Sequence, residues 1–116
     1  MSVKSKVYLE DILDCINNIQ NYTKGQSYED FEDNKMLVDA VLRNLEVIGE
    51  AVKKIPSDLK KKYSEVEWKK MAGLRDILIH EYFGIDLRII WDIVVNKLPS
   101  LKTSIQKIIK ENSSPF

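Results

Sequence analysis

Cysteine and histidine, two of the commonest metal ligands, are almost absent from this chain. Among its 116 residues there is one cysteine, Cys15, and one histidine, His80. The single cysteine excludes an internal disulfide and a zinc site made of cysteines alone. The single histidine excludes a three-histidine metal centre and the HExxH zinc motif. The sequence also lacks a glycine-rich phosphate loop and a CxxC pair. We therefore expect neither a bound metal nor a cofactor.

Turn-forming residues and long apolar runs are scarce as well. Four glycines and three prolines are too few for the many turns of an all-β sandwich or barrel. The longest apolar runs, such as residues 77–79, have three residues, whereas a membrane span needs about 18. Residues 1–7 do not lead into the apolar segment of a signal peptide. We expect a cytoplasmic protein with no membrane partner.

Charge is balanced over the whole chain but not along it. The 18 basic and 18 acidic side chains cancel, which argues against a protein that coats nucleic acid non-specifically. Residues 53–75, however, hold eight basic and three acidic side chains, whereas residues 1–52 hold five basic and ten acidic ones. The basic segment permits a phosphate-binding face. A solvated lysine surface on a helical protein is the alternative interpretation.

Length and hydrophobic periodicity together indicate the fold class. A chain of 116 residues, with 44% hydrophobic and 31% charged residues, is typical of a single globular domain, here residues 1–116. Apolar residues recur at steps of three and four almost throughout, and no segment alternates with a period of two. The sequence predicts an all-α fold, a four-helix up-down bundle with an extra short helix and a kinked C-terminal helix.

Capping and breaking residues set the boundaries of the first two helices. The first is predicted over residues 4–22, and Gly25 then breaks the chain. Ser27 is expected to cap a second helix that runs without interruption to Pro56, which stops it. This second helix carries an apolar seam at Val38, Val41, Leu45, Ile48, Val52 and Ile55.

Similar signals predict the later helices. Ser57 is expected to cap a short helical turn, and the pair Ser64 and Glu67 reads as a capping box that starts the third long helix. That helix is predicted to end at Tyr82 or Phe83, with Gly84 in a left-handed conformation.

The last helix has a start signal and an internal breaker. Asp86 is expected to cap it. Its apolar pattern continues to residue 108 across Pro99, which cannot donate a backbone hydrogen bond and crowds the preceding turn. We expect a kink or a short break there.

The candidate functional residues lie in one short stretch. Arg75, His80 and Tyr82 fall within eight residues of otherwise apolar sequence. Taken alone, the histidine is more often a core or helix-end residue than a catalyst. On the same interpretation the arginine would be an ordinary ion-pair partner, and the tyrosine a core aromatic with its hydroxyl at the rim. Glu46 and Glu50, one turn apart, are best interpreted as solvated or ion-paired surface residues.

The arrangement of these residues nevertheless resembles a known signature. The order Arg75-x4-His80-x-Tyr82, followed by residues 83–86 (Phe-Gly-Ile-Asp), resembles that of the HEPN superfamily and, within it, of the HepT-like toxins. Residues 43–51, 68–75 and 87–91 resemble flanking blocks of the same family, in the same order. The resemblance covers roughly residues 5–110.

The resemblance implies a metal-independent ribonuclease, and the residue types suit that chemistry. His80 can exchange protons near neutral pH, and Arg75 offers a permanent cation with a planar fork for phosphoryl oxygens. Tyr82 would hydrogen-bond phosphate or stack on a base, and Asp76 would orient or pair with one of these groups. The family often has asparagine at the position of Asp76. The aspartate of this chain adds a carboxylate there, which would partly neutralise the charge of Arg75.

The resemblance also implies a partner. HepT-like toxins are paired with a minimal nucleotidyltransferase antitoxin, related to MntA, that transfers AMP to the motif tyrosine, here Tyr82. The added phosphate would place negative charge near Arg75 and His80 and so block RNA. Two alternatives are a non-catalytic HEPN protein that binds nucleotide or serves as a scaffold for its nucleotidyltransferase, and a helical scaffold without nucleotide chemistry.

Helix geometry complicates the site. On an ideal helix Tyr82 lies within about 20° of Arg75, but His80 lies about 140° away. Either the helix unwinds near His80, or two copies of the motif meet across a two-fold axis. The family resemblance favours the second arrangement, a homodimer with a shared cleft that binds RNA.

Overall fold

The computed structural model describes residues 1–113, and in that range the chain forms helices and no strands. The elements in chain order are α1 Val3–Thr23, α2 Tyr28–Asp33, α3 Lys35–Lys54, α4 Ser57–Lys62, α5 Trp68–His80, the 3-10 turn η1 Tyr82–Gly84, α6 Leu87–Asp92, the π-helical turn η2 Ile93–Lys97 and α7 Leu98–Asn112. The expected all-α fold is confirmed.

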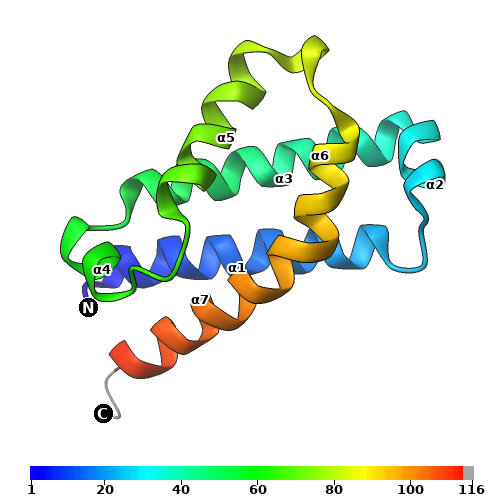
Figure 1. The fold of residues 1–116 in the computed structure, drawn as a ribbon. Coiled ribbons are helices and arrows are strands. Elements are labelled where there is room, and N and C mark those ends of the chain that lie inside the picture. The colour runs from blue at the N-terminus through cyan, green and yellow to red at the C-terminus, as the bar shows by residue number, and fades with distance from the viewer. Residues whose placement is uncertain (114–116) are drawn as a thin grey trace.

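The long helices form an up-down bundle. α1 and α3 lie side by side and antiparallel, α5 packs on α3, and α7 runs back across α1 (Figure 1). The predicted seam of α3 is buried throughout. It belongs to the same buried cluster as apolar side chains from α1 and α7, namely Leu9, Ile12, Ile16, Ile19, Leu98, Leu101, Ile105 and Ile108. Burial of these faces is the main force that holds the bundle together.

The second predicted helix is two helices, which corrects the expectation of one uninterrupted element. Gly25 has a φ of 74° in the turn after α1, and Ser27 forms a capping box with Asp30, both as expected. The chain then breaks at Asn34, whose backbone is extended and whose side chain accepts a hydrogen bond from the amide of Leu37. Asparagine competes with helix continuation in this way, and it starts α3 anew.

Two predicted caps between α3 and α5 are wrong. Ile55 is extended before Pro56, as expected, but Pro56 itself occupies the N-cap of α4, so Ser57 lies within the helix. Ser64 forms no capping box. α5 begins at Trp68 with Glu67 at its N-cap, and the Glu67 carboxylate pairs with lysines.

The end of α5 also differs from the prediction. The α-helix ends at His80, two or three residues early, and a 3-10 turn follows it. Gly84 has no positive φ, because the 3-10 turn replaces the expected left-handed cap. Asp86 caps α6 as expected, and its carboxylate accepts a hydrogen bond from the amide of Arg88.

The predicted irregularity near Pro99 is present. The turn directly before it, Ile93–Lys97, is π-helical, and Pro99 stands in the first turn of α7. The π-helical turn is wider than an α-helical one and so makes room for the proline ring. In the first turn of a helix an amide hydrogen has no partner within the helix, so proline is tolerated there. The C-terminal helix is therefore kinked, as expected.

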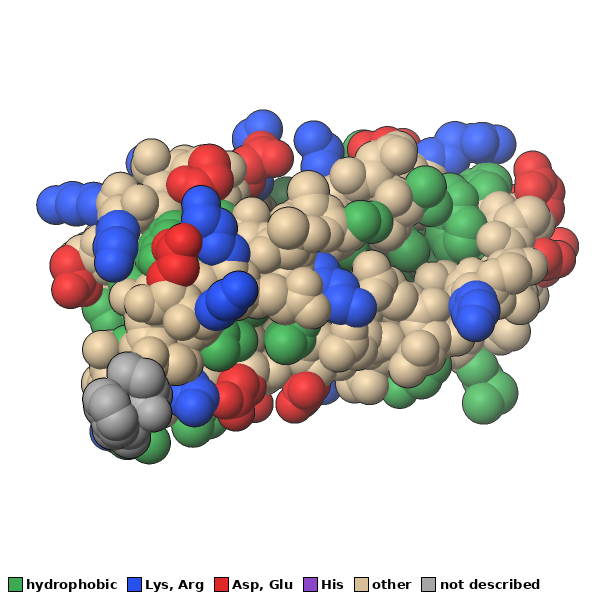
Figure 2. Space-filling view, turned by 90° about the horizontal axis from the view of Figure 1, so that it is seen from below, with side chains coloured by type: hydrophobic (Ala, Val, Ile, Leu, Met, Phe, Trp, Pro, Cys, Tyr) green, Lys and Arg blue, Asp and Glu red, His purple; other side chains and the backbone are tan. Residues whose placement is uncertain are grey.

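The surface carries charges of both signs. On the face seen from below in Figure 2, basic and acidic side chains are interspersed with hydrophobic ones, and no histidine appears. Within residues 1–113, no helix combines the length and the apolar character that a membrane crossing requires.

Candidate functional site

Gly49 brings α3 and α5 into close contact where Arg75 leaves its helix. A Cβ atom built on Gly49 would lie 2.3 Å from the Cβ of Arg75 and 2.8 Å from the carbonyl oxygen of Met71. No side chain can occupy that space, so only glycine permits this approach. The contact fixes the Cβ end of the Arg75 side chain against α3.

The Arg75 guanidinium lies between two carboxylates. Nη1 is 3.3 Å from Oδ1 of Asp76, and Nη2 is 3.7 Å from Oε1 of Glu50. The Nε atom is buried and has no hydrogen-bond partner among residues 1–113, while 25% of the side chain is exposed. Arg75 is thus ion-paired and oriented, with its outer part open to solvent. Glu50 is ion-paired, as expected.

Asp76 joins this cluster from the exposed side of α5. Its carboxylate accepts hydrogen bonds from Lys53 on α3 and from Arg75. These bonds, that of Lys53 first, lower the pKa of the Asp76 carboxyl. An ionised Asp76 therefore faces both cations, in agreement with the expectation that it pairs with one of the site residues.

His80 stands at the last residue of α5 with its side chain exposed. The helix is regular up to this residue and ends there, so the chain does leave the α-helical path near His80, but only after His80 itself. Arg75 and His80 leave the same helix on faces about 140° apart. One protomer by itself does not bring the two side chains together.

Tyr82 lies outside α5, which overturns its expected place on the face of Arg75. Because the helix has ended, its ring belongs to the 3-10 turn η1, and its hydroxyl donates a hydrogen bond to Asp39 on α3. This bond raises the pKa of the Tyr82 phenol and lowers that of the Asp39 carboxyl. The side chain remains 39% exposed.

Sequence reasoning missed two residues of this region, Asp39 and Lys53. Both belong to a polar stripe of α3 that runs beside the buried seam, with steps of four and three: Asp39, Arg43, Glu46, Glu50 and Lys53. A polar stripe with the period of the seam marks the edge of a packed helix face. That signal was available, and three of its members contact α5 or the turn after it.

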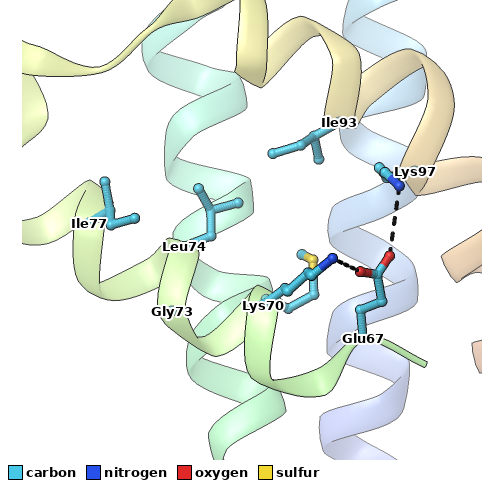
Figure 3. A pocket seen from close by; sticks show the side chains of 8 residues that line it. Glu67, Lys70, Gly73, Leu74, Ile77, Ile93 and Lys97 are labelled. Carbon is cyan, nitrogen blue, oxygen red and sulfur yellow. Dashed lines mark ion pairs between the residues drawn. The ribbon is translucent and has the colours of Figure 1, made fainter. Parts of the chain in front are cut away.

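An apolar hollow lies between α5 and the turn η2 (Figure 3). It encloses about 410 Å³, and Leu74, Ile77 and Ile93 point into it from the two walls. At its rim Glu67 pairs with Lys70 and Lys97. Ile77 is half exposed, and Phe83 in the turn beyond is fully exposed.

The sequence matches a family model and several relatives. The model described as "Ribonuclease HepT-like" matches residues 12–108. "Probable ribonuclease HepT" of Thermococcus cleftensis is 46% identical over 95% of this chain and all of its own length. "Putative RNase MJ1216" of Methanocaldococcus jannaschii is 48% identical over 91% of this chain and 88% of its own.

A third relative, from another genus, agrees with these two. "Putative RNase TTE0752" of Caldanaerobacter subterraneus is 44% identical over 90% of this chain and 93% of its own length. No solved structure matches the chain. Since both the family model and the relatives span nearly all of the bundle, the chain belongs to the HepT-like ribonuclease family of the HEPN superfamily.

Proposed function

We propose that this protein is a metal-independent endoribonuclease and the toxin of a toxin–antitoxin pair. The observation that supports this most is that one helix carries both an oriented arginine and an exposed histidine. Arg75 is fixed by Gly49 and Glu50, whereas His80 meets solvent at the helix end. These are the two groups that RNA cleavage without a metal needs.

The chemistry proceeds by attack within the RNA. His80 takes the proton of a ribose 2′-hydroxyl, and the oxygen forms a bond to the adjacent phosphorus. Arg75 stabilises the negative charge that develops on the phosphoryl oxygens. The bond to the 5′-oxygen of the next nucleotide breaks, water gives that oxygen a proton, and His80 returns the proton it took to the solvent. The products are a 2′,3′-cyclic phosphate and a free 5′-hydroxyl.

A two-fold homodimer would complete the cleft. The faces of Arg75 and His80 diverge within one protomer, so a phosphate reaches both groups more easily when the second copy supplies one of them. The exposed apolar side chains Ile77 and Phe83, on and just after α5, are suited to such a contact.

Regulation would act at Tyr82. A nucleotidyltransferase antitoxin of the MntA type would transfer AMP to its hydroxyl: the phenol oxygen bonds to the α-phosphorus of ATP and pyrophosphate leaves. Tyr82 is partly exposed in a turn after a helix end, which supports access by such an enzyme. Each AMP adds about one negative charge near the cleft, which would repel RNA.

The nuclease proposal is tested with variants that leave the fold intact. His80→Ala and Arg75→Ala should each abolish growth arrest on expression, and the purified variants should lose RNA cleavage. Arg43→Ala is the matched control, because Arg43 is exposed and pairs only with Glu46 among the described residues. Equal toxicity of wild type and His80→Ala would contradict the proposal.

The regulatory proposal is tested by co-expression with the nucleotidyltransferase. Intact mass should show one or more added AMP units on the wild type and loss of nuclease activity, whereas Tyr82→Phe should stay unmodified. Modification and silencing of Tyr82→Phe to the same extent as wild type would place the site on another residue.

A second candidate function has one observation in its favour. Two carboxylates, Glu50 and Asp76, already occupy the Arg75 guanidinium, as would suit a non-catalytic HEPN protein that binds nucleotide or serves as a scaffold for its nucleotidyltransferase. Binding of RNA or nucleotide without any cleavage, in wild type and His80→Ala alike, would favour this function.

A further inference from the structure

The turn after α5 lies at the surface of the bundle. None of the three residues of η1 is buried, and Phe83 is fully exposed. Within the turn, the amide of Glu81 bonds to the carbonyl of Ile77, and that of Gly84 to the carbonyl of Glu81. These bonds close the turn on itself, but they do not attach it to the rest of the bundle.

The hydrogen bond from Tyr82 to Asp39 attaches the turn itself to α3, whereas Ile85, the residue after the turn, packs against the core. The bond joins the turn to the first half of α3, 43 residues away in the sequence. Lys35, one helical turn before Asp39, lies 3.4 Å from the same carboxylate and helps to hold it. A phenol that donates to a carboxylate forms a stronger bond than one between neutral groups.

His80 lies between two points at which α5 and its turn are fixed to α3. On one side, Arg75 packs on Gly49 and Asp76 pairs with Lys53. On the other side, the Tyr82 hydroxyl bonds to Asp39. Helix ends fray unless something restrains them, and His80 is the last residue of its helix. The second attachment therefore bears directly on where the imidazole lies.

We propose that Asp39 is a positioning residue, which holds Tyr82 and through it the end of α5 that carries His80. The effect of Asp39 on catalysis rests on the proposed ribonuclease function, whereas its effect on the position of His80 does not. Asp39 would touch neither RNA nor the reacting atoms. Its part is to keep the imidazole in one place, which matters because small displacements of a catalytic group cost rate.

The same contact links the proposed modification to the histidine. A phenol that carries a phosphodiester has no hydrogen to donate, and its negative charge would face the ionised Asp39. AMP on Tyr82 would therefore break the attachment and release the end of α5, in addition to blocking RNA.

The test uses His80 as its own probe, because the sole histidine gives a single imidazole signal in NMR spectra. Asp39→Ala and Tyr82→Phe should shift that signal in the same direction, toward its position in an unfolded peptide. The amides of Glu81 and Gly84 should exchange about threefold faster or more. The double variant should shift the imidazole signal and speed the amide exchange no more than either single variant does.

Two controls separate positioning from general weakening of the fold. Asp39→Asn keeps an oxygen acceptor and should restore most of the wild-type signal. Tyr63 and Glu111 form another phenol–carboxylate bond, between the end of α4 and α7, so Glu111→Ala removes a comparable bond far from His80 and should leave its signal unmoved. An unchanged imidazole signal in both Asp39→Ala and Tyr82→Phe would overturn the proposal.

RNA cleavage is measured on the same samples. Asp39→Ala should lower kcat several-fold with little change in KM, and Asp39→Asn should recover it. If the NMR changes occur but the wild type cleaves no RNA, positioning stands and the ribonuclease proposal fails. If RNA is cleaved and the imidazole signal of the variants is that of wild type, the positioning role fails alone.

Discussion

At Gly49 the absence of a side chain decides how closely two helices approach. The residue is helical and buried, so a left-handed backbone does not explain the glycine. The explanation is steric: a Cβ atom added to Gly49 would lie only 2.3 Å from the Cβ of Arg75. One methyl group here would push α5 outward and move the guanidinium with it.

Gly49→Ala is therefore expected to destabilise the protein despite the better helix propensity of alanine. Overpacking of this kind costs about 1–3 kcal/mol, whereas the propensity gain is about 1 kcal/mol. Denaturant unfolding should show a lower midpoint, and RNA cleavage should fall because Arg75 is displaced. Gly73→Ala is the matched control, since a Cβ there meets no atom within 4 Å. Equal or higher stability of Gly49→Ala would contradict the packing argument.

The second prediction at the scale of single residues concerns the charge of Asp76. Its carboxylate neutralises part of the charge of Arg75 and Lys53. Asp76→Asn removes the negative charge and should free both cations for phosphate. We expect a lower KM for RNA and a steeper loss of affinity with salt, because more cations would contact the backbone. Weaker RNA binding by Asp76→Asn would show that the carboxylate orients Arg75 more than it neutralises it.

At the scale of elements, the break at Asn34 shows how a polar cap overrides an apolar pattern. Its side chain accepts the hydrogen bond of the Leu37 amide and so starts α3. Asn34→Ala should cost about 0.5–2 kcal/mol of stability, as loss of an N-cap does elsewhere. Asn34→Asp keeps the acceptor and should unfold at the wild-type midpoint. The idea fails if the alanine variant is as stable as wild type.

Periodicity was enough to predict most of the helical architecture. The buried seam of α3, the stops at Gly25 and Pro56, and the kink before Pro99 follow from spacing and from the chemistry of single residues. Local chemistry misled at Ser64 and Gly84. At the observed ends of α5 the structure instead shows contacts that form only in the folded bundle, between Glu67 and Lys97 and between Tyr82 and Asp39, and no local pattern encodes them.

The candidate site was predictable only in part for the same reason. The motif residues Arg75, His80 and Tyr82 stand out in the sequence, and so does their order. Glu50 pairs with Arg75, Lys53 with Asp76 and Asp39 with Tyr82. Each partner lies more than 20 residues away in the sequence and reaches α5 or its turn only because the bundle is folded. The polar stripe beside the seam is the one local signal that pointed to them.

At the scale of the whole molecule, the proposed cleft requires two copies of the chain, and exposed apolar side chains are available for the contact between them. Ile77 is 50% exposed and Phe83 is fully exposed. We expect light scattering at micromolar concentration to give twice the chain mass of 13.5 kDa. Ile77→Arg should shift the protein to monomer and lower cleavage, because a buried charge opposes association.

Met36→Arg serves as the control for this prediction. Met36 is also an exposed apolar residue, at the start of α3 rather than on α5. It should leave the dimer intact. A wild-type monomer at this concentration would count against the shared cleft.

In the proposed mechanism the RNA itself supplies the nucleophile, and His80 and Arg75 supply the proton acceptor and the stabilising positive charge. The most direct measurement offers the purified protein, in EDTA, an RNA oligonucleotide and the matching DNA, and identifies the products by mass. We expect the RNA to be cut to a 2′,3′-cyclic phosphate or its hydrolysis product, and the DNA, which lacks the attacking hydroxyl, to stay whole. Strict dependence on Mg²⁺, or equal cutting of the DNA, would contradict this mechanism.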